Sequence, residues 1–144
     1  MRVRLNSIVV DDQVKAVQFY TEVLGFVVKT DIPAGGGRWI TVVPPDERDG
    51  PELVLEPSGM DIATTYRKGL YAKGVPYTAL ASDNVQEEYE KLKARGVVFT
   101  ASPSKPEGSS TSSGPSRSSG GTTVIQRPPP AGMSVFTTKP RTSV

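Results

Sequence analysis

Four side chains in the sequence could take part in ligand binding or chemistry. Glu52 opens an apolar segment and could act as a base or hold a cation, and the Tyr77 hydroxyl could donate a hydrogen bond. Arg38 and Trp39 follow three glycines and offer a cation beside a flat apolar ring. Simpler interpretations stand beside these: Glu52 as a solvent-facing strand residue, and both aromatic residues as core. Glu52 is the one candidate catalytic residue.

Histidine and cysteine are both absent from the 144 residues. Their absence excludes Ser-His and Cys-His mechanisms and every zinc or iron site that needs imidazole or thiolate. A chain without cysteine forms no disulfide, which fits a reducing compartment. No apolar run approaches the roughly 20 residues of a membrane-spanning helix. The N-terminus is polar, so we expect a cytoplasmic protein with no signal peptide and no membrane partner.

The formal net charge of +2 hides an uneven distribution. Residues 102–144 contain five basic residues and one acidic residue, a net charge of +4, which leaves −2 for residues 1–101. The cations of the C-terminal part are scattered among serines and prolines, with no basic face and no interleaved aromatic residues. Such a pattern does not favour nucleic-acid binding.

Hydrophobic spacing indicates the elements that must position the candidate residues. Residues 1–56 predict the order β-α-β-β-β. The predicted strands, rich in β-branched residues, cover 3–10, 26–30, 39–43 and 52–56. The helix between the first two strands begins at Asp12, a common N-cap residue, and ends at Gly25. Its expected buried stripe consists of Val14, Val17, Tyr20 and Leu24.

The pattern starts again after a connector at 57–75, which includes a short helical stretch at 62–70. Residues 76–101 predict three elements: a strand at 77–81, a helix that Asp83 caps with Gln86 in a capping box, and a strand at 97–100. Gly96 ends this second helix.

The two halves match in register. Asp12 and Asp83 are 71 residues apart, as are Gly25 and Gly96. A constant offset of this kind indicates an internal repeat of one structural unit. The alternative is two unrelated strand-helix-strand segments that share common caps.

The segment from Ile8 to Phe26 carries a family resemblance. Its Ile-Val-Val-Asp-Asp-Gln opening and its Phe-Tyr-Thr-Glu-Val-Leu-Gly-Phe ending closely resemble the start of glyoxalase and bleomycin-resistance proteins of the vicinal-oxygen-chelate superfamily. Asp83 to Val97 resembles the start of the second module of that family. The resemblance implies an α+β fold of paired βαβββ modules, whose curved mixed sheets form a cleft. One fold in this family hosts many chemistries.

The resemblance also implies where a metal would bind, because metal enzymes of the family hold a divalent ion in that cleft. The four ligand positions fall on Leu5, Glu52, Tyr77 and, less closely, Gln126. Leucine offers no lone pair, a phenol is a poor ligand, and a single carboxylate holds a cation weakly. We therefore expect neither a family-type metal site nor another cofactor. An all-oxygen Mg²⁺ site in which Glu56 or Gln126 joins Glu52 stays open.

Residues 102–144 depart from the family pattern and predict an incomplete or irregular second module. Nine of the 20 residues in 102–121 are serine, four are glycine and three are proline, a composition typical of a flexible linker. Short β-like runs follow at 122–126 and 133–138. Two origins stay open for this region: a natural insertion, or a shifted reading frame or replaced segment.

Three functions compete at this point. The first is metal-free binding of a small molecule in a cleft that a homodimer partner completes, as the resemblance implies. The ligand-binding residues would then be Leu5, Arg38, Trp39, Glu52, Tyr77 and Gln126, with Leu5, Glu52 and Tyr77 converging on the cleft. The mildly acidic residues 1–101 would suit a cationic ligand. The second function is that of a lyase, isomerase or dioxygenase that uses a metal or a Glu52 of strongly shifted pKa. The third is an inert relative.

Overall fold

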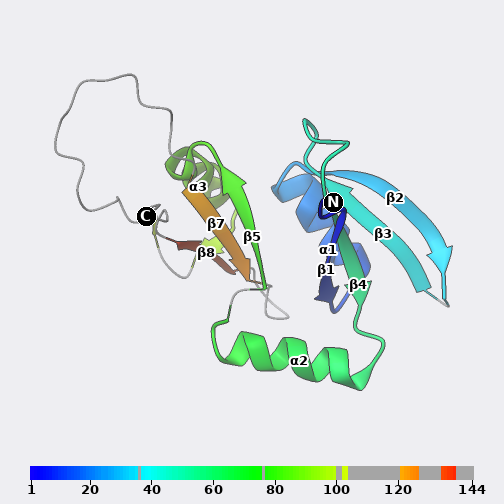
Figure 1. The fold of residues 1–144 in the computed structure, drawn as a ribbon. Helices are drawn as coiled ribbons and strands as arrows, with labels where there is room; N and C mark the ends of the chain where they lie inside the picture. Colours follow the sequence, from blue (N-terminus) through cyan, green and yellow to red (C-terminus); the bar gives the residue numbers. More distant parts are fainter. Residues whose placement is uncertain (36, 76, 100–101, 104–120, 127–133, 139–144) are drawn as a thin grey trace, which may run out of the picture. The chain divides into compact units, whose positions relative to one another are not determined.

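The chain folds as two compact units, Met1–Ala72 and Lys73–Val144, each with one four-stranded mixed sheet (Figure 1). The computed structural model describes residues 1–35, 37–75, 77–99, 102–103, 121–126 and 134–138, the last two segments by their backbone alone. Sheets and helices occur in both units, which confirms the predicted α+β class.

The first unit has the predicted order β-α-β-β-β. Its strands are β1 (Leu5–Val10), β2 (Val27–Ala34), β3 (Gly37–Val43) and β4 (Glu52–Pro57). They lie in the order β1-β4-β3-β2, with β1 parallel to β4 and the other neighbours antiparallel. The first and last strands of the module are therefore adjacent, and the central strands β3 and β4 supply its most deeply buried side chains.

The helix between β1 and β2 begins where the sequence predicts. The Asp12 carboxylate accepts hydrogen bonds from the backbone N–H groups of Val14 and Lys15, at 2.9 and 3.1 Å. These bonds satisfy two of the N–H groups that the first helical turn leaves unpaired. Gly25 ends the helix with a φ of +78°, a conformation that L-residues with a side chain rarely adopt.

The same helix changes its hydrogen-bonding pattern halfway. α1 (Gln13–Gln18) continues as a π-helical turn, η1 (Phe19–Val23), in which the N–H of Leu24 donates to the carbonyl of Phe19 at 3.1 Å. A π turn accommodates one residue more than an α turn. Phe19 and the adjacent Tyr20 are buried.

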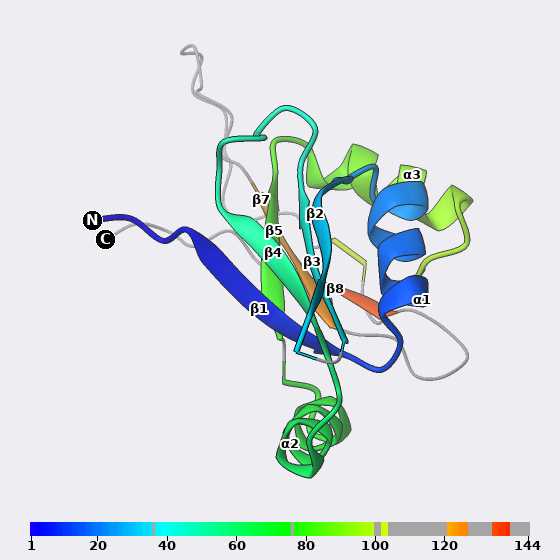
Figure 2. The ribbon, with the colours of Figure 1, turned by 90° about the vertical axis from the view of Figure 1, so that its right-hand side faces the viewer.

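Alternation along the strands places apolar side chains on one face of the first sheet. The pairing of β1 with β4 and of β4 with β3 puts these buried residues together: Ile8, Val10, Ile40, Val42, Leu53 and Leu55. Figure 2 shows α1 running alongside the sheet. Val14, expected in the buried stripe of this helix, is 55% exposed. It lies in the first helical turn, where side chains point back toward the N-terminus.

The connector contains α2 (Asp61–Ala72), which is longer than the predicted stretch and belongs to the first unit. The hydroxyl and the backbone N–H of Ser58 both donate to the carbonyl of Val10, at 2.8 and 3.0 Å. These bonds fix the start of the connector against the end of β1. Among the described residues, no helix is both long enough and apolar enough to cross a membrane.

The second unit repeats the element order of the first with a different strand order. It contains β5 (Thr78–Ser82), α3 (Val85–Ala94), β6 (Val98–Phe99), β7 (Gly121–Gln126) and β8 (Ser134–Thr138). The sheet runs β5-β7-β8-β6, so that the third strand of the module lies beside the first. In the first sheet the fourth strand has that place. Of the two predicted alternatives, incomplete or irregular, the second module is irregular: four strands are present, in a different order.

The N-cap of α3 is Asn84, and the predicted cap at Asp83 was wrong. The Asn84 side chain accepts from the N–H of Glu87 at 3.2 Å and donates to the Glu87 carboxylate at 2.9 Å. Asn84 has the non-helical backbone that a cap requires, with φ −138° and ψ 83°, and this shifts the capping partner from Gln86 to Glu87. Gly96 ends the helix as predicted, with a φ of +84°.

The corrected cap makes the two helices differ by one residue. Asp12 and Gly25 are 13 positions apart, whereas Asn84 and Gly96 are 12 positions apart. The extra residue of the first helix is accommodated by its π turn. The repeat is therefore close but not exact.

Candidate functional site

Leu5 and Glu52 lie side by side on adjacent strands. They are paired in the parallel register of β1 with β4, so their side chains leave the same face of the sheet. The Leu5 residue is 45% exposed, and the Glu52 side chain is 11% exposed. Two of the positions that the family resemblance selects are thus neighbours in the first unit.

The face that carries Glu52 has a buried apolar centre. We refer to it as the Glu52 face, and define it by the residues of β1, β3 and β4 whose register and alternation place them on that side: Leu5, Ser7, Val9, Trp39, Thr41, Val43, Glu52, Val54 and Glu56. Thr41, Val43 and Val54 are almost completely buried. Glu52 therefore adjoins a patch with little access to water.

A β-bulge in β2 introduces a cation onto this face. The pairing of β2 with β3 shifts between Val28 and Thr30, which leaves Lys29 as the extra residue. The Lys29 ammonium lies 3.0 Å from Oε1 of Glu52, although β3 separates their strands. The long side chain therefore extends across β3 to reach the carboxylate.

A second cation and the loop before β4 complete the cluster. Nη2 of Arg4 lies 3.4 Å from Oε1 of Glu52, and its Nη1 donates to the carbonyl of Asp49 at 3.0 Å. The Lys29 ammonium also donates to the carbonyl of Arg48, at 2.6 Å. Each cation is thus held between the Glu52 carboxylate and a backbone carbonyl of the loop at 44–51.

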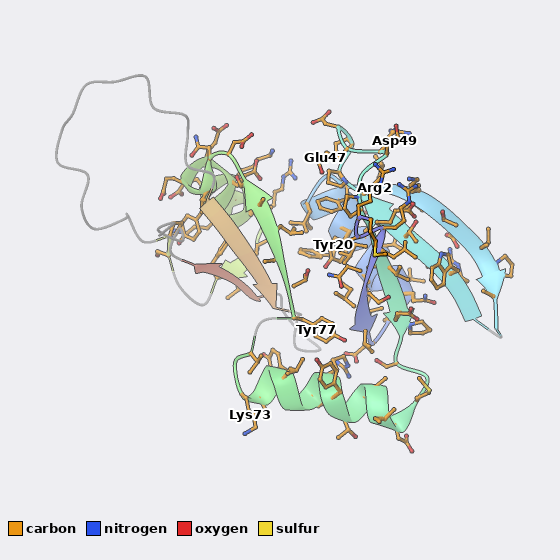
Figure 3. All side chains as sticks on the ribbon, in the orientation of Figure 1. Arg2, Tyr20, Glu47, Asp49, Lys73 and Tyr77 are labelled. Carbon is orange, nitrogen blue, oxygen red and sulfur yellow. The ribbon has the colours of Figure 1, made fainter. Side chains whose placement is uncertain are left out.

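Charged residues of both signs surround this end of the first sheet. Glu47 and Asp49 belong to the loop at 44–51, and Arg2 precedes β1; all three are labelled in Figure 3. Among the described residues, Glu52 is the acidic residue whose side chain is buried. The cluster is a partly buried ion-pair network, and its two cations face one carboxylate.

The cations decide the protonation state of Glu52. The hydrogen bond from Lys29 is the largest cause that holds the pKa of Glu52 below its ordinary value, and the charge of Arg4 acts in the same direction. The Thr41 hydroxyl also lowers the pKa of Glu52. Its oxygen makes no hydrogen bond of ordinary geometry to any described residue. Glu52 is therefore ionised at neutral pH and is a weak base.

The residues of the Glu52 face do not fit a family-type metal ion. Leu5 has no donor atom, and the Glu52 carboxylate is already engaged by two cations. Glu56 leaves the same face four residues along β4, roughly 13 Å away at the usual rise of a strand, and accepts a hydrogen bond from Ser7 at 3.3 Å. One Mg²⁺ ion, with oxygen ligands at about 2.1 Å, cannot reach both carboxylates. The alternative in which Glu56 joins Glu52 was thus wrong.

Three-residue metal clusters are also missing elsewhere in the described part of the chain. Within it, no group of three or more histidine, cysteine, aspartate or glutamate side chains could hold a metal ion.

Arg38 and Trp39 leave opposite faces of β3. Trp39 is partly exposed and shares the Glu52 face, because it lies two residues from Thr41, which pairs with Val54. Arg38 leaves the other face and donates to the Asp31 carboxylate at 2.9 Å. Consecutive strand residues alternate in direction, so only Trp39 can belong to a site around Glu52.

Tyr77 and Gln126 belong to the second unit. Tyr77 is half-buried and immediately precedes β5, and Gln126 is the last residue of β7, paired with Ser134. Gln126 therefore lies on the third strand of its module, not on the last one. That either residue joins Leu5 and Glu52 around a ligand stays a prediction.

Sequence reasoning missed Lys29 and Arg4, which contact the one carboxylate it selected. A lysine directly after the apolar run Phe26-Val27-Val28 was a visible signal. No local pattern indicated the bulge that directs Lys29 toward Glu52, because a bulge depends on pairing with a neighbouring strand.

Comparison with known proteins identifies the family. Residues 3–113 match the Glyoxalase/Bleomycin resistance protein/Dioxygenase superfamily. The chain belongs to this superfamily. The uncharacterized protein YurT of Bacillus subtilis (strain 168) is 47% identical over 105 residues, which cover 73% of this chain and 83% of YurT. The family expectation from the Ile8 to Phe26 segment is confirmed.

Two solved structures match 95% of this chain. The crystal structure of UcmS2 has a TM-score of 0.70 and 29% identity, and the match covers 95% of this chain and 97% of UcmS2. TnmS3, an antibiotic binding protein from Streptomyces sp. CB03234, has a TM-score of 0.61 and 24% identity, with coverages of 95% and 94%. The likeness to TnmS3 is one of fold.

Proposed function

We propose that this superfamily member binds a small drug-like molecule on the Glu52 face without a family-type metal ion. The observation that carries the proposal is the Lys29–Glu52–Arg4 cluster, in which protein cations engage the carboxylate. On the same face Leu5 and Trp39 are exposed or partly exposed, and they offer apolar surface to a ligand body. The antibiotic binding protein TnmS3 supports the proposal because its fold is similar.

The enzymatic alternative requires properties that Glu52 lacks. A general base at neutral pH needs a raised pKa, whereas the cations lower the pKa of Glu52. Metal-assisted chemistry requires a converging set of ligands, which the Glu52 face does not provide. We therefore favour binding over lyase, isomerase or dioxygenase activity.

The cluster also bears on the charge of the ligand. Both cations approach the same Glu52 oxygen, so a cationic ligand would have to displace one of them. A neutral aromatic molecule, or one with oxygen acceptors, fits better than the cationic ligand that the overall charge of residues 1–101 suggests.

We further propose that the protein acts in the cytoplasm as a homodimer. Light scattering during gel filtration would test the dimeric state.

A thermal-shift screen of the full-length protein tests the binding proposal. The panel contains bleomycin as a cationic antibiotic, together with neutral aromatic antibiotics, each at increasing concentration. A ligand at about 100 times its Kd stabilises the native state by about 2.7 kcal/mol. We expect a neutral aromatic compound to raise Tm in a concentration-dependent way, and Leu5→Asp, at an exposed apolar position of the Glu52 face, to abolish the effect.

The screen has two informative controls. Ile62→Asp, at an exposed apolar position of α2 outside the Glu52 face, should leave the ligand-induced shift unchanged. Elemental analysis of the purified protein should show no stoichiometric transition metal. A tightly bound ion, or a panel without any shift, would contradict the proposal.

A further inference from the structure

The Lys29 ammonium occupies a site lined by oxygen atoms. It donates to the Arg48 carbonyl at 2.6 Å and lies 3.0 Å from the Glu52 carboxylate. The neighbouring carbonyl of Asp49 accepts from Arg4. Carboxylate and carbonyl oxygens are the groups that bind hard cations such as Mg²⁺ and Ca²⁺ in proteins. The surroundings of Nζ thus resemble a cation site whose cation is covalently attached to the chain.

A third oxygen near the cluster lacks an ordinary partner. Thr41 is fully buried on the Glu52 face, and its Oγ1 has no hydrogen-bond partner among the described residues. A buried hydroxyl without a partner is unfavourable, because it loses its hydrogen bonds to water. It is available to a cation or water molecule that enters beside Glu52.

The position of Lys29 is unusual for a lysine. Its side chain is 27% exposed, whereas lysine side chains are mostly solvent-exposed. Ordering this long side chain over β3 has a cost in conformational entropy, and the bulge interrupts the ladder of an edge strand. The contacts of Nζ must offset both costs.

We infer that Lys29 is the resident cation of an oxygen-lined cation site formed by Glu52, the Arg48 carbonyl and Thr41. Its ammonium supplies the positive charge that these oxygen atoms face. Shortening the Lys29 side chain removes this charge and opens the site. A free cation then takes the place of the ammonium. This inference goes beyond the proposed function, since it holds whether or not a ligand binds.

Chemical rescue of Lys29→Ala in the full-length protein tests the inference. Propylammonium has the atoms that this substitution removes, and 1-propanol is its neutral counterpart of the same size. We expect Lys29→Ala to lower Tm by about 3–4 °C, and propylammonium to restore at least half of that loss. We expect Mn²⁺ to stabilise Lys29→Ala as well, and neither cation to affect the wild type beyond a NaCl control of equal ionic strength.

Three further variants test whether the rescue depends on the charge of Lys29 and on the Glu52 carboxylate. Lys29→Met keeps the aliphatic stem but removes the charge, and should be destabilised. Lys29→Ala combined with Glu52→Gln should not be rescued, because the carboxylate is gone. Lys15→Ala, which removes an exposed lysine 3.8 Å from Asp12, should show little change and no rescue.

Two results would overturn the inference. One is a Lys29→Met protein as stable as the wild type, which would show that the charge is not needed. The other is a rescue that is not specific. Either propylammonium stabilises Lys29→Ala and the double variant equally, or 1-propanol stabilises Lys29→Ala as much as propylammonium does. Because all readouts are of stability without ligand, failure here is distinct from failure of the antibiotic screen.

Discussion

Arg67 of α2 forms an ion pair with Asp11, the residue that follows β1. The Arg67 side chain is 10% exposed and that of Asp11 is 35% exposed, so the two partners differ in their access to water. Together with the bonds from Ser58 to the Val10 carbonyl, this pair attaches the connector helix to the first sheet. The helix thereby becomes part of the first unit.

The unequal burial of this pair predicts unequal effects of mutation. Asp11→Asn leaves the buried Arg67 guanidinium without its carboxylate, and should reduce the free energy of unfolding by about 2–3 kcal/mol. Arg67→Met removes the buried charge and keeps its volume, and should cost about 1–2 kcal/mol. Urea denaturation measures both values. The double variant should resemble Arg67→Met; simple addition of the two losses would contradict the pairing.

The lowered pKa of Glu52 predicts how stability depends on pH. Because the folded-state pKa lies below its ordinary value of 4.5, Glu52 contributes stability above pH 4.5. That contribution is lost as the pH falls through the folded-state pKa. The difference in unfolding free energy between wild type and Glu52→Gln should therefore be constant near pH 7 and shrink below pH 4.5. In a Lys29→Met background the pH dependence of this difference should weaken; an unchanged profile would exclude Lys29 as its cause.

The left-handed conformation of Gly25 predicts that a side chain at this position destabilises the protein through backbone strain and not through a steric clash. A β-carbon at Gly25 would meet no atom within 4 Å, but its φ of +78° is unfavourable for alanine. We expect Gly25→Ala to cost about 1–2 kcal/mol and Gly25→Asn to cost less. Gly59→Ala is the control, since that site is equally open and has no positive φ. Equal losses at both positions would argue against the helix end described.

The N-cap of α3 can be tested by paired substitutions. Asn84→Ala removes the acceptor of the Glu87 N–H and should destabilise the protein by about 1 kcal/mol. Asp83→Ala should change stability by less than about 0.5 kcal/mol, because Asp83 is exposed and precedes the cap. Thermal unfolding distinguishes the two; a larger loss for Asp83→Ala would restore the cap that the sequence predicts.

The sequence predicted helix caps, helix ends and strands where these depend on residues close together in the chain. The cap at Asp12 and the helix ends at Gly25 and Gly96 follow from preferences within one turn of helix. The strands of the first module follow from β-branched runs. The same reasoning failed by one residue at Asn84, because aspartate and asparagine are both good caps and only the backbone of the turn selects between them.

The sequence by itself determined the βαβββ order of the first module, the family, and the absence of imidazole and thiolate ligands, because each is a property of residue type and short-range spacing. The tertiary structure decided that Lys29 and Arg4 engage Glu52, that Arg38 and Trp39 point apart, and that the strand order differs between the sheets. Lys29 is 23 residues from Glu52 in the chain, and their contact depends on a bulge, on the length of a lysine side chain and on the order of three strands. Long-range pairing fixes all of these together, and no local pattern encodes it.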